Sequence, residues 1–308
     1  MSVEPVASDG ATPRLGAVPG PRAPGGARPT VALALGGGGA RGLAHIHVIE
    51  TLDELGVRPV AVAGSSIGAI MGAALCAGVP GTAIRAHVMA TLANKAEMAA
   101  RLWRLRPPLM GGVARGAATL RFGQVDVVRL MHAFLLPLPA TFEELSIPLT
   151  VTATDFYDHV EVHLTRGDLG SALAASAAIP GVFRPVRREG RIYVDGGIYN
   201  PCPFDLVKDK ADVTIAVDVV GAPTGDPSRE PTTLDCLIGA NQLMMRSLIE
   251  AKSKVAPPDI MLRPAPAPIR ALDFHRAVEI MDGTAGLREE LIAALARHGV
   301  HREEAGAA

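Results

Sequence analysis

The sequence has little cysteine and almost no net charge, and each shortage excludes a class of protein. Its 308 residues include 30 basic and 31 acidic side chains, which gives a formal net charge of −1. A near-neutral chain has no electrostatic footprint for DNA or RNA, because their binding needs a clustered basic face. The three cysteines are odd in number and widely spaced, which supports neither a disulfide framework nor a zinc site. We therefore expect a protein of a reducing compartment, the cytoplasm, that binds no nucleic acid.

Uninterrupted hydrophobic runs are also missing where a targeting or membrane segment would need them. Residues 1–29 contain no continuous apolar stretch, so they are predicted to form a disordered leader rather than a signal peptide. The 26 residues between Arg58 and Arg85 carry no charge, but glycines and prolines interrupt them. A strand, a tight turn and a buried helix are predicted there in place of a membrane span.

Glycine and proline are abundant, with 33 and 25 residues, yet 48% of the chain is hydrophobic, which is too much for a disordered protein. The glycines gather at residues 36–42, 64–72 and 195–197, each time at the end of a predicted strand. Strands alternate with helices, which predicts an α/β fold with a mainly parallel sheet. We predict strands at 31–35, 60–63, 147–155, 160–164, 191–194, 212–219 and 259–262, and helices at 41–55, 67–77, 171–178, 233–254 and 272–297.

The first glycine cluster follows the strand at 31–35. Within it, Gly37, Gly39 and Gly42 satisfy the pattern G-x-G-x-x-G between a strand and a helix. Glycine lets the backbone approach a ligand closely and leaves N–H groups free near a helix N-terminus. These donors suit either the pyrophosphate of a nucleotide or the oxyanion of a reaction. A nucleotide site would also need an acidic residue at the end of the next strand, and none follows Ala63.

The second cluster contains a serine in the pattern G-x-S-x-G. Gly64 and Gly68 flank Ser66 between a predicted strand and a predicted helix, which is the setting of a nucleophile elbow. The two glycines remove side chains that would collide in the strained turn, so Ser66 is predicted to be the nucleophile. Ser65 is the competing serine, and its alternative role is that of a turn hydroxyl bonded to nearby backbone.

A serine nucleophile needs a base, and the histidines are poor candidates. His45 and His47 follow the first glycine cluster, but helical spacing points them to different faces. The late histidines have no supporting motif. Asp195, followed by Gly196 and Gly197, ends a predicted apolar strand and is therefore a candidate general base, with a structural turn aspartate as the alternative.

Taken in order, these three motifs resemble the patatin-like phospholipase family, particularly its bacterial members and its neuropathy-target-esterase branch. The resemblance extends over residues 31–297, and the segments at 152–155 and 175–183 are also similar to family segments. It implies a three-layer sandwich with a mainly parallel central sheet and helices on both faces. The motifs that carry it are Gly37-Gly38-Gly39-Ala40-Arg41-Gly42, Gly64-Ser65-Ser66-Ile67-Gly68 and Asp195-Gly196-Gly197.

The resemblance also implies a mechanism without histidine, metal or cofactor. In a Ser–Asp dyad of this kind, Ser66 attacks an ester carbonyl and Asp195 accepts its proton, while N–H groups of Gly37, Gly38 and Gly39 hold the oxyanion. Arg41 has two expected roles: it either orients this loop, or contacts a phosphate, with a structural salt bridge as the competing interpretation. The expected substrate is a lipid or another acyl ester. The alternatives are a nucleotide-binding protein that uses the G-x-G-x-x-G turn and a non-catalytic lipid-binding relative.

The expected organisation is a leader at 1–29, a catalytic domain at 30–300 with a helical cap at about 95–145, and a flexible tail at 301–308. Such an enzyme is expected to act without a preceding regulatory or membrane domain. Two interpretations stay open for an Arg-rich stretch in the cap: peripheral contact with an anionic membrane, or an ordinary solvated helix face. Its residues are Arg101, Trp103, Arg104, Arg106, Arg115 and Arg121.

Overall fold

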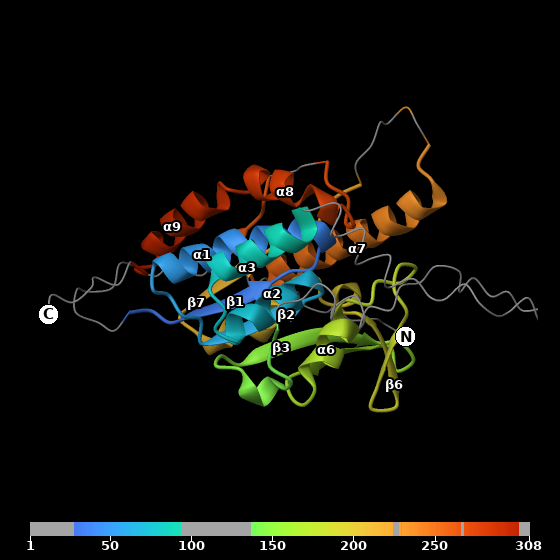
Figure 1. The fold of residues 1–308 in the computed structure, drawn as a ribbon, viewed down its shortest axis with the longest axis horizontal. Helices are drawn as coiled ribbons and strands as arrows, with labels where there is room; N and C mark the ends of the chain where they lie inside the picture. The colour runs from blue at the N-terminus through green and yellow to red at the C-terminus, as the bar shows by residue number, and fades with distance from the viewer. Residues whose placement is uncertain (1–27, 94–136, 224–227, 229, 266–267, 302–308) are drawn as a thin grey trace, which may run out of the picture.

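A central β-sheet organises the chain, and its strands follow the order β5-β6-β3-β2-β1-β7-β8, with β4 paired to β3 (Figure 1). The structure is a computed structural model that describes residues 28–93, 137–223, 228, 230–265 and 268–301. The strands are β1 Val31–Leu35, β2 Ala61–Ser65, β3 Leu149–Asp155, β4 Val160–Leu164, β5 Val186–Arg188, β6 Arg191–Asp195, β7 Val213–Val217 and β8 Ile260–Leu262.

The sheet is parallel from β3 through β2, β1 and β7 to β8, as the alternation of strands and helices predicts. Its other end is antiparallel, because β4 and β6 both run opposite to β3 and β5 runs opposite to β6. The sequence gives no signal for β5, a three-residue strand in which one valine precedes two arginines. The described sheet is therefore mixed, with a parallel centre.

Helices cover both faces of the sheet and complete the three layers. On one side, α1, α3, α8 and α9 lie together (Figure 1), and α2 and α6 belong to the same core. On the other side, α7 and the segment around Phe204 pack against the sheet. The helices are α1 His45–Glu54, α2 Ile67–Cys76, α3 Gly81–Val88, α6 Leu169–Ser176, α7 Thr233–Val255, α8 Ala277–Gly283 and α9 Leu287–Arg297, and the 3₁₀ turns used below are η1 Gly39–Ala44, η4 Gly196–Ile198 and η7 Phe274–Arg276.

The alternating side chains of β1 explain the two layers. Val31, Leu33 and Leu35 point to the larger core beneath α1 and α2, while Ala32 and Ala34 point to the smaller core beneath α7. Small side chains on that second face let a long helix approach the sheet closely. This helix also forms one wall of the candidate site.

One predicted element is wrong. The helix expected at 272–297 is divided into η7, α8 and α9. The break lies at 284–286, after Gly283 ends α8; Gly283 and Gly286 weaken the helix here, and the hydroxyl of Thr284 donates to the carbonyl of Ile280 at 2.8 Å. The division lets α8 contact η1 while α9 packs along α1.

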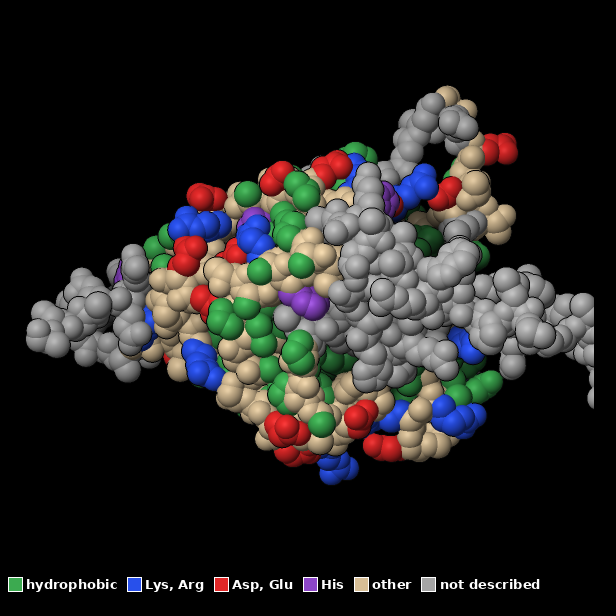
Figure 2. All heavy atoms as spheres, in the orientation of Figure 1, with side chains coloured by type: hydrophobic (Ala, Val, Ile, Leu, Met, Phe, Trp, Pro, Cys, Tyr) green, Lys and Arg blue, Asp and Glu red, His purple; other side chains and the backbone are tan. Residues whose placement is uncertain are grey.

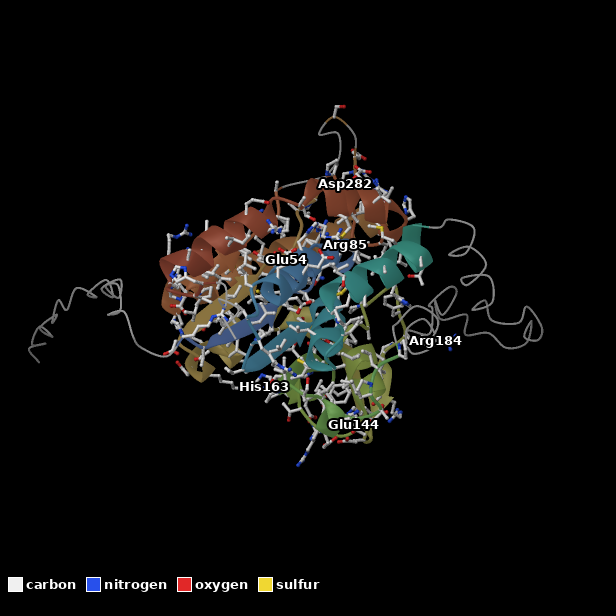
Figure 3. The ribbon with its side chains drawn as sticks, turned by 60° about the vertical axis from the view of Figure 1, so that its left-hand side comes forward. Glu54, Arg85, Glu144, His163, Arg184 and Asp282 are labelled. Atoms are coloured by element: carbon white, nitrogen blue, oxygen red, sulfur yellow. The ribbon has the colours of Figure 1, made fainter. Side chains whose placement is uncertain are left out.

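Most charged side chains lie on the surface of this framework, and those that are buried include Asp155, Arg188, Asp195 and Asp218. On the face shown in Figure 2, acidic and basic groups are interspersed over the described surface. Figure 3 shows Glu54, Arg85 and Asp282 on the side of the α1, α3 and α8 helices, and Glu144 and His163 on the opposite side of the molecule. Within the described ranges, no helix combines the length and the apolar character needed to cross a bilayer. The Arg-rich stretch between Arg101 and Arg121 lies outside the described residues, as do 1–27, 94–136 and 302–308 of the predicted leader, cap and tail.

Candidate active site

Strand β3 brings the serine and aspartate motifs together. Thr152 pairs with Ser65 of β2, and the next residue, Ala153, pairs with Asp195 of β6. The same stretch of β3 pairs with β4 along its other edge. Because a strand has only two edges, β2 and β6 must meet end to end on one of them. Two motifs separated by about 130 positions of sequence thus become neighbours, with Ser66 and Asp195 at the junction.

Ser66 has the backbone conformation of a nucleophile elbow. Its φ of 52° and ψ of −123° are rare for a residue with a side chain. The turn is tight, because a Cβ atom on Gly68 would lie 2.1 Å from the carbonyl oxygen of Leu35. The N–H of Ser66 donates to Oγ of Ser176 at 2.8 Å. The strained turn is therefore held from both sides, by the close packing of α2 and by the last residue of α6.

The side chains of Ser66 and Asp195 form a direct hydrogen bond. The Ser66 hydroxyl donates to Oδ2 of Asp195 at 2.7 Å, and the N–H of Gly197 donates to Oδ1 at 2.7 Å. Both side chains are buried. Burial raises the pKa of Asp195 to about 6, although the two hydrogen bonds favour the ionised form. Asp195 is thus a carboxylate that is mostly ionised at neutral pH and is more basic than an exposed aspartate.

In the glycine turn before η1, the sequence predicts three N–H groups that are free to bind a ligand, and one of the three has a partner in the structure. The N–H of Gly37 donates to the carbonyl of Pro201 at 2.8 Å, so this donor is already engaged. The N–H groups of Gly38 and Gly39 form no hydrogen bond with any described residue, and both glycines line a cavity with Ser66. Gly39 has a φ of 62°, and a Cβ there would lie 2.1 Å from the carbonyl oxygen of Ala271. Of the three N–H groups that the sequence predicts at an oxyanion, that of Gly37 is thus bonded to Pro201, and those of Gly38 and Gly39 have no partner among the described residues.

The cavity has a volume of about 290 Å³ and connects the dyad to an apolar wall. Ser66, Asp195, Gly38 and Gly39 are among the residues that line it. The wall comes mainly from α7 and from the segment after α6, with side chains suited to a hydrocarbon group. They include Ile179, Val182, Leu237, Ile238, Met245 and Leu272.

Arg41 also lines the cavity, but its guanidinium contacts backbone carbonyls. Nε donates to the carbonyl of Val219 at 3.2 Å, and Nη1 donates to that of Ile269. Burial lowers its pKa, while Asp273 and Asp218 raise it. These contacts join η1 to two distant loops, which favours the interpretation in which Arg41 orients the turn.

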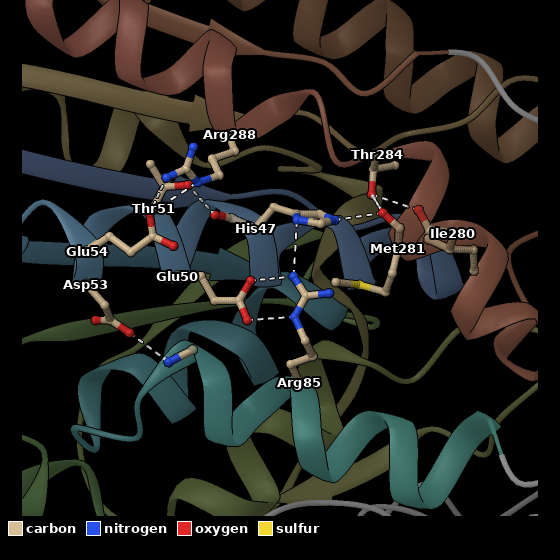
Figure 4. A network of polar contacts seen from close by, with 11 residues as sticks. His47, Glu50, Thr51, Asp53, Glu54, Arg85, Ile280, Met281, Thr284 and Arg288 are labelled. Carbon is tan, nitrogen blue, oxygen red and sulfur yellow. Dashed lines mark hydrogen bonds and ion pairs between the residues drawn. The ribbon is translucent and has the colours of Figure 1, made fainter.

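The two early histidines are bonded to backbone carbonyls. His45 is fully buried, and its Nε2 lies 2.8 Å from the carbonyl of Gly36. His47 contacts the carbonyl of Met281 at 2.8 Å and Arg85 at 3.2 Å, within the network that joins α1 to α3 and α8 (Figure 4). Neither contact involves Ser66 or Asp195.

Ser65 does not have the role expected for a turn hydroxyl. Its side chain is fully buried, and its Oγ has no hydrogen-bond partner among the described residues. The predicted bond to nearby backbone is therefore wrong. Ser65 ends β2 with its side chain on the same face as Ala61 and Ala63, so pleating turns it into the core beside α7.

Two contacts of the site had no individual signal in the sequence. Ser176 belongs to the segment 175–183 that resembles the family, but nothing in that pattern assigns its hydroxyl to the N–H of Ser66. Pro201 lies 164 positions after Gly37 and binds it through a backbone carbonyl, which any residue type could supply. Within the described part of the chain, no three His, Cys, Asp or Glu side chains are grouped so as to hold a metal ion.

Known proteins are similar to this chain over the region that contains Ser66 and Asp195. The family described as patatin-like phospholipase matches residues 33–208. An uncharacterized NTE family protein of Mycobacterium tuberculosis is 40% identical over 211 residues, which cover 68% of this chain and 54% of that protein. A lysophospholipase of Mycosarcoma maydis is 30% identical over 197 residues, 62% of this chain and 10% of that protein.

The chain thus spans about half the length of the mycobacterial relatives that it matches. Among solved structures, VipD from Legionella pneumophila is similar with a TM-score of 0.43 and 17% identity, and the match covers 85% of this chain and 67% of VipD. The type III effector ExoU is similar with a TM-score of 0.37 and 18% identity, over 90% of this chain and 54% of ExoU.

Proposed function

The chain belongs to the patatin-like phospholipase family, and from this premise we propose that it is a serine acyl hydrolase acting on phospholipids, lysophospholipids or related acyl esters. One observation carries the proposal. The Ser66 hydroxyl donates to Asp195 at 2.7 Å in the lining of an apolar cavity that Gly38 and Gly39 also line, and the N–H groups of these two glycines have no partner among the described residues. Nucleophile, base and oxyanion donors are therefore within one small space.

In the acylation step, Oγ of Ser66 attacks the ester carbonyl carbon and its proton passes to Oδ2 of Asp195. The burial that raises the pKa of Asp195 favours this transfer, because it replaces a poorly solvated carboxylate with a neutral acid. The carbonyl oxygen becomes an oxyanion, which Gly38 and Gly39 stabilise through their N–H groups. When the tetrahedral intermediate collapses, the alcohol leaves with the proton from Asp195, and the acyl group stays on Ser66.

Water then hydrolyses the acyl-enzyme by the same route in reverse. Asp195 accepts a proton from the attacking water, the same two N–H groups stabilise the second oxyanion, and the protonated Asp195 returns the proton to Ser66 as the acid leaves. The apolar wall from α7 would hold the acyl chain during both steps. The chemistry of the described site thus needs the dyad and the glycine turn alone.

The test combines turnover with covalent labelling. Purified wild-type protein should hydrolyse p-nitrophenyl butyrate and release fatty acid from lysophosphatidylcholine, and a fluorophosphonate should label Ser66, as read by peptide mass spectrometry. Ser66→Ala should lose both turnover and labelling. Ser65→Ala is the matched control, because it removes a neighbouring hydroxyl that has no partner among the described residues, and it should retain both.

Asp195→Asn should lose turnover while it remains folded, because an amide cannot accept the proton of Ser66. Full activity in the Ser66→Ala protein would refute the proposal. Binding to liposomes without turnover or labelling would instead support a non-catalytic lipid-binding relative. Saturable binding of NAD or ATP that weakens in a Gly39 variant would support a nucleotide-binding protein.

A further inference from the structure

One peptide group lies directly before the oxyanion donors and is held at both of its polar ends. The carbonyl of Gly36 is 2.8 Å from Nε2 of His45, and the N–H of Gly37 donates to the carbonyl of Pro201 at 2.8 Å. These two groups belong to the same planar peptide unit. Fixing both of them fixes the orientation of the plane from which the chain continues to Gly38 and Gly39.

The tautomer of His45 follows from this contact. A carbonyl can only accept, so Nε2 of His45 carries the hydrogen and donates to Gly36, which leaves Nδ1 as an acceptor. Nδ1 is buried and has no partner within the described ranges. Burial also lowers the pKa of His45 to about 4, so the ring is neutral at neutral pH. The side chain therefore makes one strong polar contact and leaves its other nitrogen unsatisfied.

An apolar residue would avoid the unfavourable burial of an unpaired nitrogen at this position. Among the described residues, what His45 gains over such a residue is its hydrogen bond to Gly36. The carbonyl of Gly36 is also close to α2, because a Cβ on Gly68 would lie 2.6 Å from it. The imidazole and the start of the elbow helix thus confine the same oxygen atom.

We propose that His45 is a positioning residue for acyl transfer: its Nε2–H orients the Gly36–Gly37 peptide and thereby aims the N–H groups of Gly38 and Gly39 at the oxyanion. This inference rests on the proposed function, and it gives His45 no part in proton transfer. In this proposal His45 supports the oxyanion donors through Gly36, while the base is the carboxylate of Asp195.

The experiment compares two buried histidines that are two residues apart on α1. His45→Leu removes the donor to Gly36, and His45→Gln retains an N–H at a similar distance from the backbone. His47→Leu is the matched control, because His47 is also buried and contacts a carbonyl at 2.8 Å, but that carbonyl belongs to Met281 in α8. Steady-state hydrolysis of p-nitrophenyl butyrate and thermal unfolding are measured for the wild type and these three variants.

His45→Leu should lower kcat by at least about tenfold, with KM within about twofold of wild type. The loss should be smaller than the factor of about 10²–10³ in rate that removal of an oxyanion donor costs. His45→Gln should recover most of kcat, and His47→Leu should lower the Tm with little effect on kcat. The inference fails if His45→Leu and His47→Leu lose kcat equally, or if the Gln variant does not recover it.

A second measurement keeps the two proposals separate. Glycine-selective ¹⁵N labelling reports the amide shifts of Gly38 and Gly39 without any need for turnover. These shifts should move in His45→Leu, and should stay close to their wild-type positions in His45→Gln, which keeps a donor to Gly36, and in His47→Leu. Unchanged shifts in His45→Leu, or shifts that move as far in His45→Gln as in His45→Leu, would overturn the inference even if wild type hydrolyses esters. Wild type without ester turnover would refute the proposed function, whatever the shifts show.

Discussion

Asp195→Asn is expected to abolish activity and to stabilise the fold. The carboxyl is buried, and a pKa of about 6 in place of 3.8 means that the folded protein disfavours its ionised form. Each pKa unit corresponds to about 1.4 kcal/mol, so the ionised group costs about 3 kcal/mol of folding free energy at pH 8. Asparagine keeps both hydrogen bonds, because its oxygen can accept from Gly197 and its amide can donate to Ser66.

The folded and unfolded pKa values of Asp195 also determine how the free energy of unfolding changes with pH. Below pH 3.8 the group is protonated in both the folded and the unfolded chain, so its burial carries no ionisation cost. As the pH rises towards 6, the unfolded chain releases the proton first, and the free energy of unfolding of the wild type falls. Above about pH 6 the contribution is constant. The advantage of Asp195→Asn should therefore be about 3 kcal/mol at pH 8 and about half of that at pH 5.

The assay is urea-induced unfolding, followed by far-ultraviolet circular dichroism at pH 5 and at pH 8. Asp218→Asn is the control for a buried carboxylate, because Asp218 has an ion pair with Arg263 at 2.9 Å and should lose stability on substitution. An Asp195→Asn protein that is no more stable than wild type at pH 8 would refute the reasoning. So would an advantage of equal size at both pH values, because that would not arise from ionisation.

Three further outcomes follow from the site. First, kcat/KM should fall tenfold per pH unit below about pH 6, because only ionised Asp195 accepts the proton; a flat profile down to pH 4.5 would contradict the role of this base. Second, Ser176→Ala should lower kcat about tenfold at an unchanged far-ultraviolet spectrum, because the N–H of Ser66 loses its acceptor in the strained turn; unchanged stopped-flow acylation rates would count against it. Third, Gly39→Ala should reduce fluorophosphonate labelling and kcat by about 10²–10³, since it combines a positive φ with a backbone collision. Gly170→Ala, where an added Cβ meets nothing within 4 Å, is its control and should label normally.

The sequence predicts those site residues that belong to a short local motif. Ser66 stands between two glycines at a strand–helix junction, and Asp195 stands before two glycines at the end of a strand, so local patterns suffice to find them. The structure places their side chains 2.7 Å apart. Their roles as nucleophile and base remain predictions that the variants above test.

The parts that could not be predicted depend on pairing between distant segments. The residues of β6 predict a short apolar strand, but no local pattern predicts its partner. In the structure β6 runs antiparallel to β3 and pairs with the same edge of β3 as β2 does. Likewise, Gly37 looks like a free donor until its partner, the carbonyl of Pro201, is known. Helical periodicity separates His45 from His47, but the 3₁₀ turn η1 before α1 sets which of them points back to Gly36.

The loop that follows Asp195 and the glycine turn before η1 form one connected unit. The carbonyl of Gly196, in η4, accepts the N–H of Asn200 at 2.9 Å, and the next residue, Pro201, accepts the N–H of Gly37 at 2.8 Å. The backbone that follows Asp195 therefore also fixes the N–H of Gly37, in the peptide whose carbonyl is bonded to His45. Because the two segments share this backbone, a movement of Asp195 would also move the N–H groups of Gly38 and Gly39. A displacement of about 1 Å in such an arrangement can cost two orders of magnitude in rate. A shift of η4 would move both Asp195 and these N–H groups, and the losses from changing Gly196 and His45 together should therefore differ from their sum.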